Sequence, residues 1–311
     1  MKSVLSIGNF EACHLGHKKL IKNNLHLGEL YSCPNLVLSF DPHPQQFFHP
    51  EIKRPFLLSQ ERKTRALEEL GVSHHFILNF NHDLNHTNYK KFYNDFLLQD
   101  LKAKAITVGE DFHFGFERKG NSTWLKEQGF KDEIQVDIIP SFYLDNERVS
   151  STRIRKILTQ GHIEEVNKLL GHSFSIEGVL VKGDQLGRKI GFPTLNLETP
   201  GQILPKDAVY CGHVWLEKLS PQKTPAIVNI DTKQLFPAVF SIGLKPTLEN
   251  KEKKHFIEAH LLDAQLPSDE LYGWKASFYF ERSIRDMIAF RNMDELIDQI
   301  KKDVCLAKSL L

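Results

Sequence analysis

Two histidines separated by a leucine and a glycine stand close to the start of the chain, in the segment SIGNFEACHLGH at residues 6–17. The apolar run at residues 4–7 predicts a short buried strand, and the amphipathic stretch at residues 18–27 predicts a helix that opens beside His17. A helix N-terminus presents unpaired N–H donors and a partial positive charge, and Gly16 lets the backbone approach an anion closely. We therefore expect His14 and His17 to donate to a phosphate group.

Two plainer interpretations of these histidines remain open. Histidines near the start of a helix are often caps or surface residues. They could also bind a metal, although no third ligand stands at a recognisable spacing.

Two more segments of the first half place acids after expected strands. The string DPHP at residues 41–44 follows an apolar run at residues 36–40, and its prolines predict a rigid loop that carries Asp41 at the carboxyl end of the strand, where ligands bind in open α/β sheets. The string GEDFHFG at residues 109–115 follows another short apolar run, and Asp111 could hold a hydroxyl or an amine. An ordinary turn and a set of core aromatics are the respective alternatives.

A cluster of hydroxyls and arginines follows in the string RVSSTRIR at residues 148–155. Ser151 and Thr152 open an expected helix, so that hydroxyls and free N–H groups gather at one terminus. Arg148 and Arg155 flank them with guanidinium groups that suit phosphate oxygens. A capped surface helix with exposed arginines is the alternative.

The second half carries a glycine-rich string, GDQLGRKIGFPTLN, at residues 183–196. Its glycines and basic residues can wrap phosphates in a loop, although the Gly-Lys-[Ser/Thr] ending of a P-loop is absent. Thr194 and Asn196 offer oxygen ligands of the hard type that magnesium prefers. A glycine-rich hairpin turn is the alternative.

A carboxylate stands on an expected strand further on, in the string IEAH at residues 257–260. Period-two alternation places Glu258 and His260 on the face opposite Ile257 and Ala259. A carboxylate near a primary alcohol can accept its proton while a phosphoryl group is transferred. A solvated strand glutamate is the alternative.

The elements that must hold these groups change in kind along the chain. Strands and helices alternate in the first half, with further helices expected at residues 59–70, 87–98 and 122–128, and this alternation predicts a parallel sheet with right-handed crossovers. After a helix at residues 163–170, short strands predict a small antiparallel barrel closed by an amphipathic helix at residues 293–310. These strands are expected at residues 176–182, 209–216, 226–230, 238–242, 255–262 and 275–280.

Composition bounds the class of protein. The formal net charge of +1 gives no global attraction to nucleic acid or to anionic membranes. The four cysteines are widely separated and form no Cys-x-x-Cys pair, so the sequence indicates neither a zinc site nor a disulfide framework. No signal-peptide region and no membrane-spanning run is apparent. We therefore expect a cytoplasmic protein with no nucleic-acid or membrane partner.

Taken together and in this order, the segments resemble the bifunctional riboflavin kinase/FAD synthetase family of bacteria. Gly-x-Phe-[acid] with His-x-Gly-His, followed by Ser-Ser-Thr-x-x-Arg, looks like the FMN adenylyltransferase module of that family, which belongs to the nucleotidylyltransferase superfamily. The strings at residues 40–44 and 108–115 are similar to that module as well. Gly-Phe-Pro-Thr-x-Asn at residues 191–196 resembles the riboflavin kinase signature, and the strings around Glu258 and at residues 271–273 match that module too.

The resemblance implies a fold and a function. It implies a Rossmann-like parallel-sheet nucleotidylyltransferase domain over residues 1–172 and a small antiparallel β-barrel riboflavin kinase domain with a closing helix over residues 173–311. Riboflavin would be phosphorylated by ATP with Mg²⁺ to FMN, and FMN would then be adenylylated by ATP to FAD with release of pyrophosphate.

The resemblance also implies roles for individual residues. His14, His17 and Arg155 would act in adenylyl transfer, and Glu258 would be the base of the kinase. Thr194 and Asn196 would hold Mg²⁺ with ATP. The other residues expected to bind nucleotide or flavin are Gly8, Phe10, Gly16, Asp41, Asp111, Arg148, Ser151, Thr152, Gly183, Gly187, Arg188, Gly191 and Pro193.

Several positions depart from the family pattern. Glu11 stands where an aspartate is usual, Leu195 where an alanine is usual, and Lys245 where an arginine commonly precedes Pro-Thr, while residues 225–236 look like an insertion. Two alternatives therefore stay open: a monofunctional FMN adenylyltransferase with an impaired kinase module, and a non-catalytic flavin-binding protein. The sequence does not indicate an oligomeric state.

Overall fold

The computed structural model describes residues 2–199, 201–218, 234–245, 254–264 and 268–311. Its contacts divide the chain into two compact units, Met1–Arg153 and Ile154–Leu311. The boundary expected at 172/173 lies after two helices, α7 (Ser151–Gln160) and α8 (Ile163–Leu170). The boundary between the two units lies instead within the first turn of α7. The α8 residue Asn167 bonds the Phe280 carbonyl and the Phe174 N–H of the second unit, at 2.8 and 2.7 Å. Which domain these helices serve stays a prediction.

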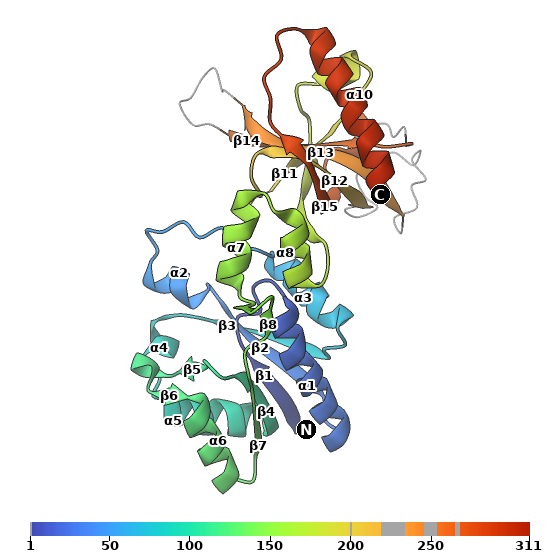
Figure 1. The fold of residues 1–311 in the computed structure, drawn as a ribbon. Helices are drawn as coiled ribbons and strands as arrows, with labels where there is room; N and C mark the ends of the chain where they lie inside the picture. Colours follow the sequence, from blue (N-terminus) through green and yellow to red (C-terminus); the bar gives the residue numbers. More distant parts are fainter. Residues whose placement is uncertain (1, 200, 219–233, 246–253, 265–267) are drawn as a thin grey trace. The chain divides into compact units, whose positions relative to one another are not determined.

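The first unit is built on a five-stranded parallel sheet, as predicted (Figure 1). Its strands are β1 (Ser3–Ile7), β2 (Asn35–Asp41), β3 (His74–Asn79), β4 (Ala103–Gly109) and β7 (Gln135–Ile139). They lie in the order β3-β2-β1-β4-β7, so the direction of winding reverses between β1 and β4. In open α/β sheets, ligands bind outside the carboxyl ends of the strands at such a reversal.

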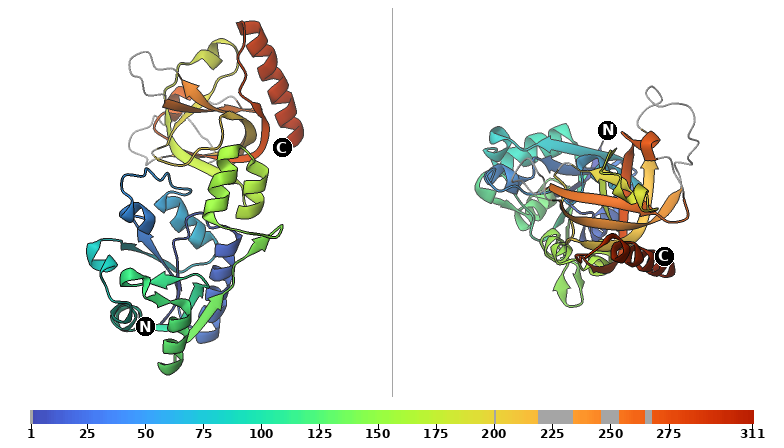
Figure 2. Two further views of the ribbon diagram at one scale, coloured as in Figure 1. Left: turned by 60° about the vertical axis from the view of Figure 1, so that its left-hand side comes forward. Right: turned by 90° about the horizontal axis from the view of Figure 1, so that it is seen from above.

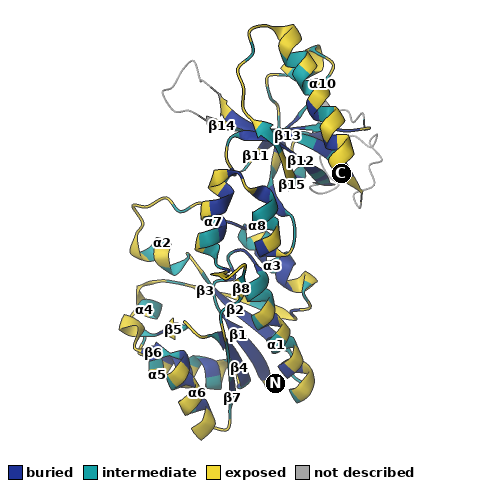
Figure 3. Cartoon of the chain, in the orientation of Figure 1, coloured by how far each residue is buried: buried dark blue, intermediate teal, exposed yellow. Residues whose placement is uncertain are grey.

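Side chains of the central strands are buried on both faces of this sheet (Figure 3). On one face, α1 (Leu15–Tyr31) and α3 (Gln60–Glu69) form a core cluster around Ile21, Val37 and Leu67. On the other face, the π-helix η1 (Phe92–Asp100) and α6 (Ser122–Lys131) form a cluster around Leu5 and Ile106. Helices therefore cover both faces, which is the doubly wound arrangement.

Three expected elements of the first unit differ from the structure. The first helix begins at Leu15, so His17 lies inside its first turn. The segment expected as a loop at residues 41–44 runs into a short helix, α2 (Pro44–Phe48), because proline is tolerated in the first turn of a helix. In place of one helix at residues 87–98, α5 (Tyr89–Lys91) runs into η1.

Short elements complete the first unit. They are α4 (His82–Asn85), the 3₁₀-helix η2 (Phe116–Arg118), the hairpin of β5 (His113–Phe114) with β6 (Gly120–Asn121), and the hairpin of β8 (Tyr143–Leu144) with β9 (Glu147–Arg148).

The second unit is a closed antiparallel barrel, as predicted. Its strands are β10 (Phe174–Val181), β11 (Leu195–Glu198), β12 (Ala208–Glu217), β13 (Leu235–Lys245), β14 (Lys254–Leu261) and β15 (Lys275–Asp286), with the short helices α9 (Leu186–Lys189) and η3 (Ser268–Leu271) between them. Phe240 packs in the interior against Phe278 and Phe280, with ring centroids 5.2 and 4.7 Å apart. Side chains thus fill this small barrel.

One strand expected in the barrel lies outside the described residues, and one observed strand was not expected. The expected strand at residues 226–230 lies outside the described residues, as does most of the suspected insertion at residues 225–236. The sequence missed β11, which begins within the last two residues of the string that was expected to be a loop.

The closing helix α10 (Met293–Leu310) has the predicted bounds and lies along the barrel (Figure 2). Ala307 packs with Cys211 and Leu262 in a buried cluster. Arg285 of β15 donates to both carboxylate oxygens of Asp303, at 2.9 and 2.7 Å, and Asp303 is 4% exposed. Apolar contact and a buried ion pair therefore both hold this helix.

Candidate functional sites

A cavity of about 800 Å³ opens at the carboxyl edge of the parallel sheet. The last residues of β1, β4 and β7 line it, together with the first turns of α1 and α7. It brings together most of the residues that the sequence predicted for the first site. These are Gly8, Phe10, His14, Gly16, His17, Asp111, Arg148, Ser151 and Thr152.

Two predicted residues stand apart from this set. Near the end of β2, Phe40 and His43 line the cavity, whereas Asp41 between them is not one of the lining residues. Arg155 belongs to the second compact unit, one helical turn beyond Ser151 on α7. The roles of Asp41 and Arg155 stay predictions.

His14 is the N-cap of α1, and its ring lies flat on the ring of His17. The two ring centroids are 3.6 Å apart with planes 11° from parallel. The Nδ1 atom of His14 accepts a hydrogen bond from the His17 N–H at 3.2 Å, so neutral His14 carries its proton on Nε2 and can donate it. A Cβ atom at Gly16 would lie 3.1 Å from the His14 ring, so glycine there makes room for this ring.

Both imidazoles are neutral in the free protein. Burial lowers the pKa of His14 to about 4, and the neighbouring Arg148 charge acts in the same direction. Burial lowers the pKa of His17 well below its ordinary value, and the charge of Lys63 and protonation of His14 act in the same direction. The histidines therefore offer polar N–H donors, and an incoming anion would favour their protonation.

Asp111 and Arg148, which the sequence assigned separately, form an ion pair of 2.6 Å. The hydrogen bond that Arg148 donates to Asp111 raises the pKa of Arg148 further. Both side chains are about half exposed, so water and substrate can reach them. The pair links the segment after β4 to strand β9 at the mouth of the cavity.

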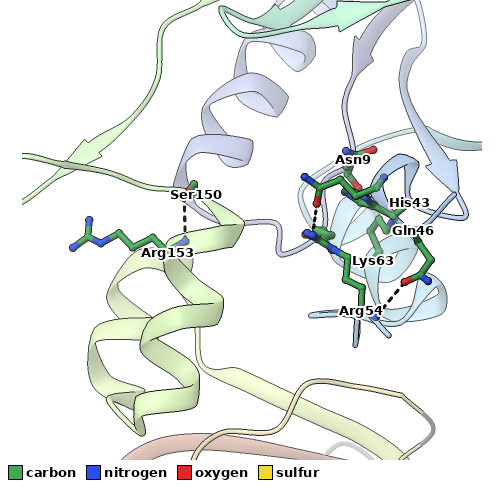
Figure 4. Close-up of polar contacts among 9 residues, drawn as sticks. Asn9, His43, Gln46, Arg54, Lys63, Ser150 and Arg153 are labelled. Atoms are coloured by element: carbon green, nitrogen blue, oxygen red, sulfur yellow. Dashed lines mark hydrogen bonds and ion pairs between the residues drawn. The ribbon is translucent and has the colours of Figure 1, made fainter. Parts of the chain in front are cut away.

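The N-terminus of α7 is capped by Ser150, whose Oγ accepts from the Arg153 N–H at 3.2 Å (Figure 4). The hydroxyls of Ser151 and Thr152 therefore do not have to serve as the cap, and both residues line the cavity. Arg153 donates to the carbonyls of Leu144 and Glu147 at 3.2 Å each, which ties this terminus to the β8–β9 hairpin.

Glu11, which stands where the family usually has an aspartate, forms an ion pair that the sequence did not indicate. Arg54 donates to both carboxylate oxygens of Glu11, at 3.2 and 2.9 Å, and both residues line the cavity. The backbone N–H of Arg54 bonds the Gln46 side chain at 3.2 Å (Figure 4). The longer acid at position 11 thus holds an arginine 43 residues away in a bidentate pair.

The sequence also did not indicate that aromatic side chains would line the cavity. Phe48, Phe80 and Phe116 line the cavity. Phe80 packs edge-on against Phe48 with centroids 5.9 Å apart, and Phe116 stacks on His86 at 5.0 Å. Such faces suit a planar aromatic ligand. These residues come from separate segments with no common spacing, so only the fold shows that they share one wall.

In the second unit, the register of the barrel brings Asn196 and Glu258 together. They are direct partners on β11 and β14, so their side chains lie on the same face. Their neighbours Leu195 and Ala259 are buried, so Asn196 and Glu258 face out of the barrel. A Cβ atom at Gly183 would lie 2.4 Å from the Asn196 amide, which places this glycine directly against that group.

Close approaches link some of the remaining residues predicted for the kinase. A Cβ atom at Gly187 would lie 3.5 Å from Thr194, and the Pro193 carbonyl lies 2.9 Å from His260 Nδ1. Arg188 is exposed at α9, and Gly191 has a φ of +89°, where glycine is favoured. Leu195 is 6% exposed, so this departure from the family pattern fills the barrel core and lies on the face away from Asn196.

Comparison with known proteins decides the family. Residues 1–153 match the model for FAD synthetase, and residues 170–311 match the model for riboflavin kinase. A bifunctional riboflavin kinase/FMN adenylyltransferase of Escherichia coli (strain K12) is 33% identical over 98% of this chain and 91% of its own length. The one of Buchnera aphidicola subsp. Acyrthosiphon pisum (strain APS) is 31% identical over 98% of this chain and 92% of its own.

The chain belongs to the bifunctional riboflavin kinase/FMN adenylyltransferase family. A member of this family has both activities, converting riboflavin to FMN and FMN to FAD with ATP, and this is the function of the chain. Both modules match, which favours the bifunctional enzyme over the monofunctional and non-catalytic alternatives.

One solved structure is similar in fold to this chain over nearly its full length. It is described as a macrolide-efflux protein from Streptococcus pneumoniae, with a TM-score of 0.83, 26% sequence identity, and coverage of 99% of this chain and 94% of that one. In the described part of the present chain, every helix is too short or too polar to cross a membrane.

Proposed function

We propose that the cavity of the first unit binds FMN and ATP for adenylyl transfer, and that the outer face of β11 and β14 carries the kinase reaction. The observation that carries the first assignment is one cavity lined by the stacked pair His14 and His17 and by the N-terminus of α7. The in-register pair of Asn196 and Glu258 supports the second.

In the adenylyl transfer, a phosphate oxygen of FMN attacks the α-phosphorus of ATP. The bond from that phosphorus to the bridging oxygen breaks, and pyrophosphate leaves with the electron pair. His14, His17, Ser151 and Thr152 donate hydrogen bonds to the phosphates, and Arg148 and Arg155 supply positive charge. Because these donors are already in place, they stabilise the developing charge without a covalent intermediate.

The rest of the first site would orient the substrates. Gly8, Phe10 and Gly16 shape the turn under the phosphates, and Asp111 and Asp41 are proposed to hold hydroxyl or amine groups. The wall of Phe48, Phe80 and Phe116 would stack on a planar ring.

In the kinase reaction, the carboxylate of Glu258 accepts the proton of the ribityl 5′-hydroxyl. The alcohol oxygen bonds to the γ-phosphorus of ATP as the bond to the β-phosphate oxygen breaks, and ADP leaves. The glycine-rich string would enclose the phosphates through Gly183, Gly187, Arg188, Gly191 and Pro193.

The residues present fit Mg²⁺ at this second site. The Thr194 hydroxyl and the Asn196 amide oxygen are hard ligands, and Gly183 leaves space for that amide. Within the described residues there is no cluster of three or more His, Cys, Asp or Glu side chains that could form a cage. The ion would therefore depend on these two residues and on substrate phosphates, which is common for magnesium. When bound, it would offset the charge of the phosphates.

The modular assignment predicts that each activity can be removed alone in the full-length chain. Purified enzyme is given ATP, Mg²⁺ and either riboflavin or FMN, and FMN and FAD are followed by chromatography. We expect Glu258→Gln to abolish FMN formation and to leave FAD formation from FMN largely intact. We expect His17→Ala to lower FAD formation by about 10²- to 10³-fold and to leave FMN formation intact.

Either variant could contradict the proposal. Loss of both activities in Glu258→Gln would refute the separation of sites, and full FAD formation by His17→Ala would refute the assignment of the cavity. The expected cytoplasmic location and the expected absence of nucleic-acid and membrane partners stay predictions from composition.

A further inference from the structure

Lys63 is a buried lysine on α3, outside every group assigned above. It is 5% exposed, and its Nζ atom donates to the carbonyl oxygen of Asn9 at 3.3 Å (Figure 4). Burying an amine costs free energy unless a polar partner compensates, and an apolar side chain could pack at such a position without that cost. The contact with Asn9 is therefore the feature that explains a lysine here.

The backbone that Lys63 contacts is strained. Phe10 and Cys13 have positive φ values of 47° and 46°, which are uncommon for residues other than glycine and persist only where surrounding structure holds them. Phe10 is fully buried, and the Cys13 N–H bonds the Phe10 carbonyl at 3.4 Å. His14, the cap of α1, follows directly. A shift of this turn would thus move both histidines of the cavity.

Burial and the neighbouring acidic groups act in opposite directions on the pKa of Lys63. Burial lowers the pKa of Lys63, while Cys13, Asp41 and Glu11 act to raise it. Both the ammonium and the neutral amine carry N–H donors, so the bond to Asn9 holds in either state.

We propose that Lys63 is a positioning residue for adenylyl transfer, which fixes the Asn9 carbonyl and so holds the strained turn that aims His14 and His17. This inference rests on the role proposed for the two histidines. It concerns a residue that is not among those lining the cavity and that acts through the backbone of another element.

The test uses the full-length enzyme, in which riboflavin kinase activity reports on the second unit and the KM for ATP in FMN adenylylation reports on the fold of the first unit. Lys63→Met removes the donor with little change in side-chain length. We expect kcat for FMN adenylylation to fall at least about 10-fold, with the KM for ATP within about threefold, because misplaced catalytic groups lower the rate more than they lower binding. Lys63→Arg keeps a long side chain with N–H donors and should recover part of this loss.

Two controls separate the possible failures. Lys22→Met makes the same change at an exposed position of α1 and should leave both activities unchanged. An adenylylation kcat within twofold of wild type in Lys63→Met, or a parallel loss of kinase activity, would overturn the role of Lys63. If His17→Ala retained full FAD formation, the site assignment itself would fail, whatever the result for Lys63.

Discussion

The absence of a side chain at Gly183 leaves room for the amide of Asn196, a proposed metal ligand. Gly183 lies so close to the Asn196 amide that an added Cβ atom would sit 2.4 Å from the amide carbon and nitrogen and 2.5 Å from its oxygen. Real Cβ atoms do not approach that closely, so the amide would have to turn away. Gly183 is therefore needed for space, independently of any turn conformation.

We expect Gly183→Ala to lower the kcat of FMN formation at least about 10-fold, because the displaced amide no longer meets Mg-ATP in the required position. FAD formation from added FMN serves as the internal control and should stay at the wild-type rate. Both are measured in the chromatographic assay. A fully active Gly183→Ala kinase would mean that the orientation of Asn196 is unimportant.

His75 is a second residue whose environment makes a measurable prediction. Its Nε2 atom lies 2.7 Å from the Ser39 hydroxyl, and its Nδ1 atom lies 2.8 Å from the Thr64 hydroxyl. Burial lowers the pKa of His75 to about 4, and the charge of Lys63 adds to this. Below pH 6.5, His75 therefore binds a proton in the unfolded chain. In the folded chain it binds a proton only as the pH approaches about 4.

The sign of this linkage is that stability is lost as the pH falls from about 6.5 towards 4. We expect His75→Gln, which keeps a donor and an acceptor but cannot be charged, to reduce the fall in Tm between pH 7 and pH 5. With allowance for partial exposure the difference should be about 1 kcal/mol, or roughly 3 °C, by calorimetry. The exposed His26→Gln is the control, and an equal effect of both variants would contradict the prediction.

At the scale of elements, α10 depends on one buried carboxylate. Asp303 accepts from Arg285 of the barrel and from Gln299 of its own helix, while the second ion pair to α10, between Lys308 and Asp263, is exposed. A buried ion pair that loses one partner leaves the other uncompensated, whereas an exposed pair contributes little.

We expect Asp303→Asn to lower the free energy of unfolding of the barrel by about 2–3 kcal/mol, and Asp263→Asn to lower it by less than about 1 kcal/mol. Urea unfolding, followed through loss of riboflavin kinase activity, measures both. Equal midpoints for the two variants would show that the buried pair does not anchor the helix.

The elements that the sequence predicted well are those with strong local signals. Gly171 ends α8 with a left-handed φ of 68°, and Asn292 caps α10, so both helices have the bounds that the sequence predicted. The sequence missed β11 because the strand has only four residues, Leu195–Glu198, and the first two belong to a glycine-rich string that was expected to be a loop. The π-helix η1 was missed because its apolar residues also satisfy an α-helical pattern.

At the scale of the whole molecule, the fold class and the family followed from the sequence, because each module carries its motifs in short local strings that stand in the order of the family. The site was predicted in part for the same reason. His14 and His17 stand in one string, whereas Arg54 and Lys63 reach the first turn from 43 and 54 residues away. Such contacts depend on tertiary packing, which no local spacing encodes.

The register between β11 and β14 also limits how the length of this chain can change. Successive residues of a strand point to opposite faces, so one inserted or deleted residue in either strand would turn Asn196 or Glu258 towards the packed interior and Leu195 or Ala259 outwards. A substitution alters one side chain, but such an insertion would remove the pair and disrupt the core in a single event. We therefore expect insertions and deletions among related enzymes to fall outside β11 and β14. The number of residues in each of these two strands should stay constant.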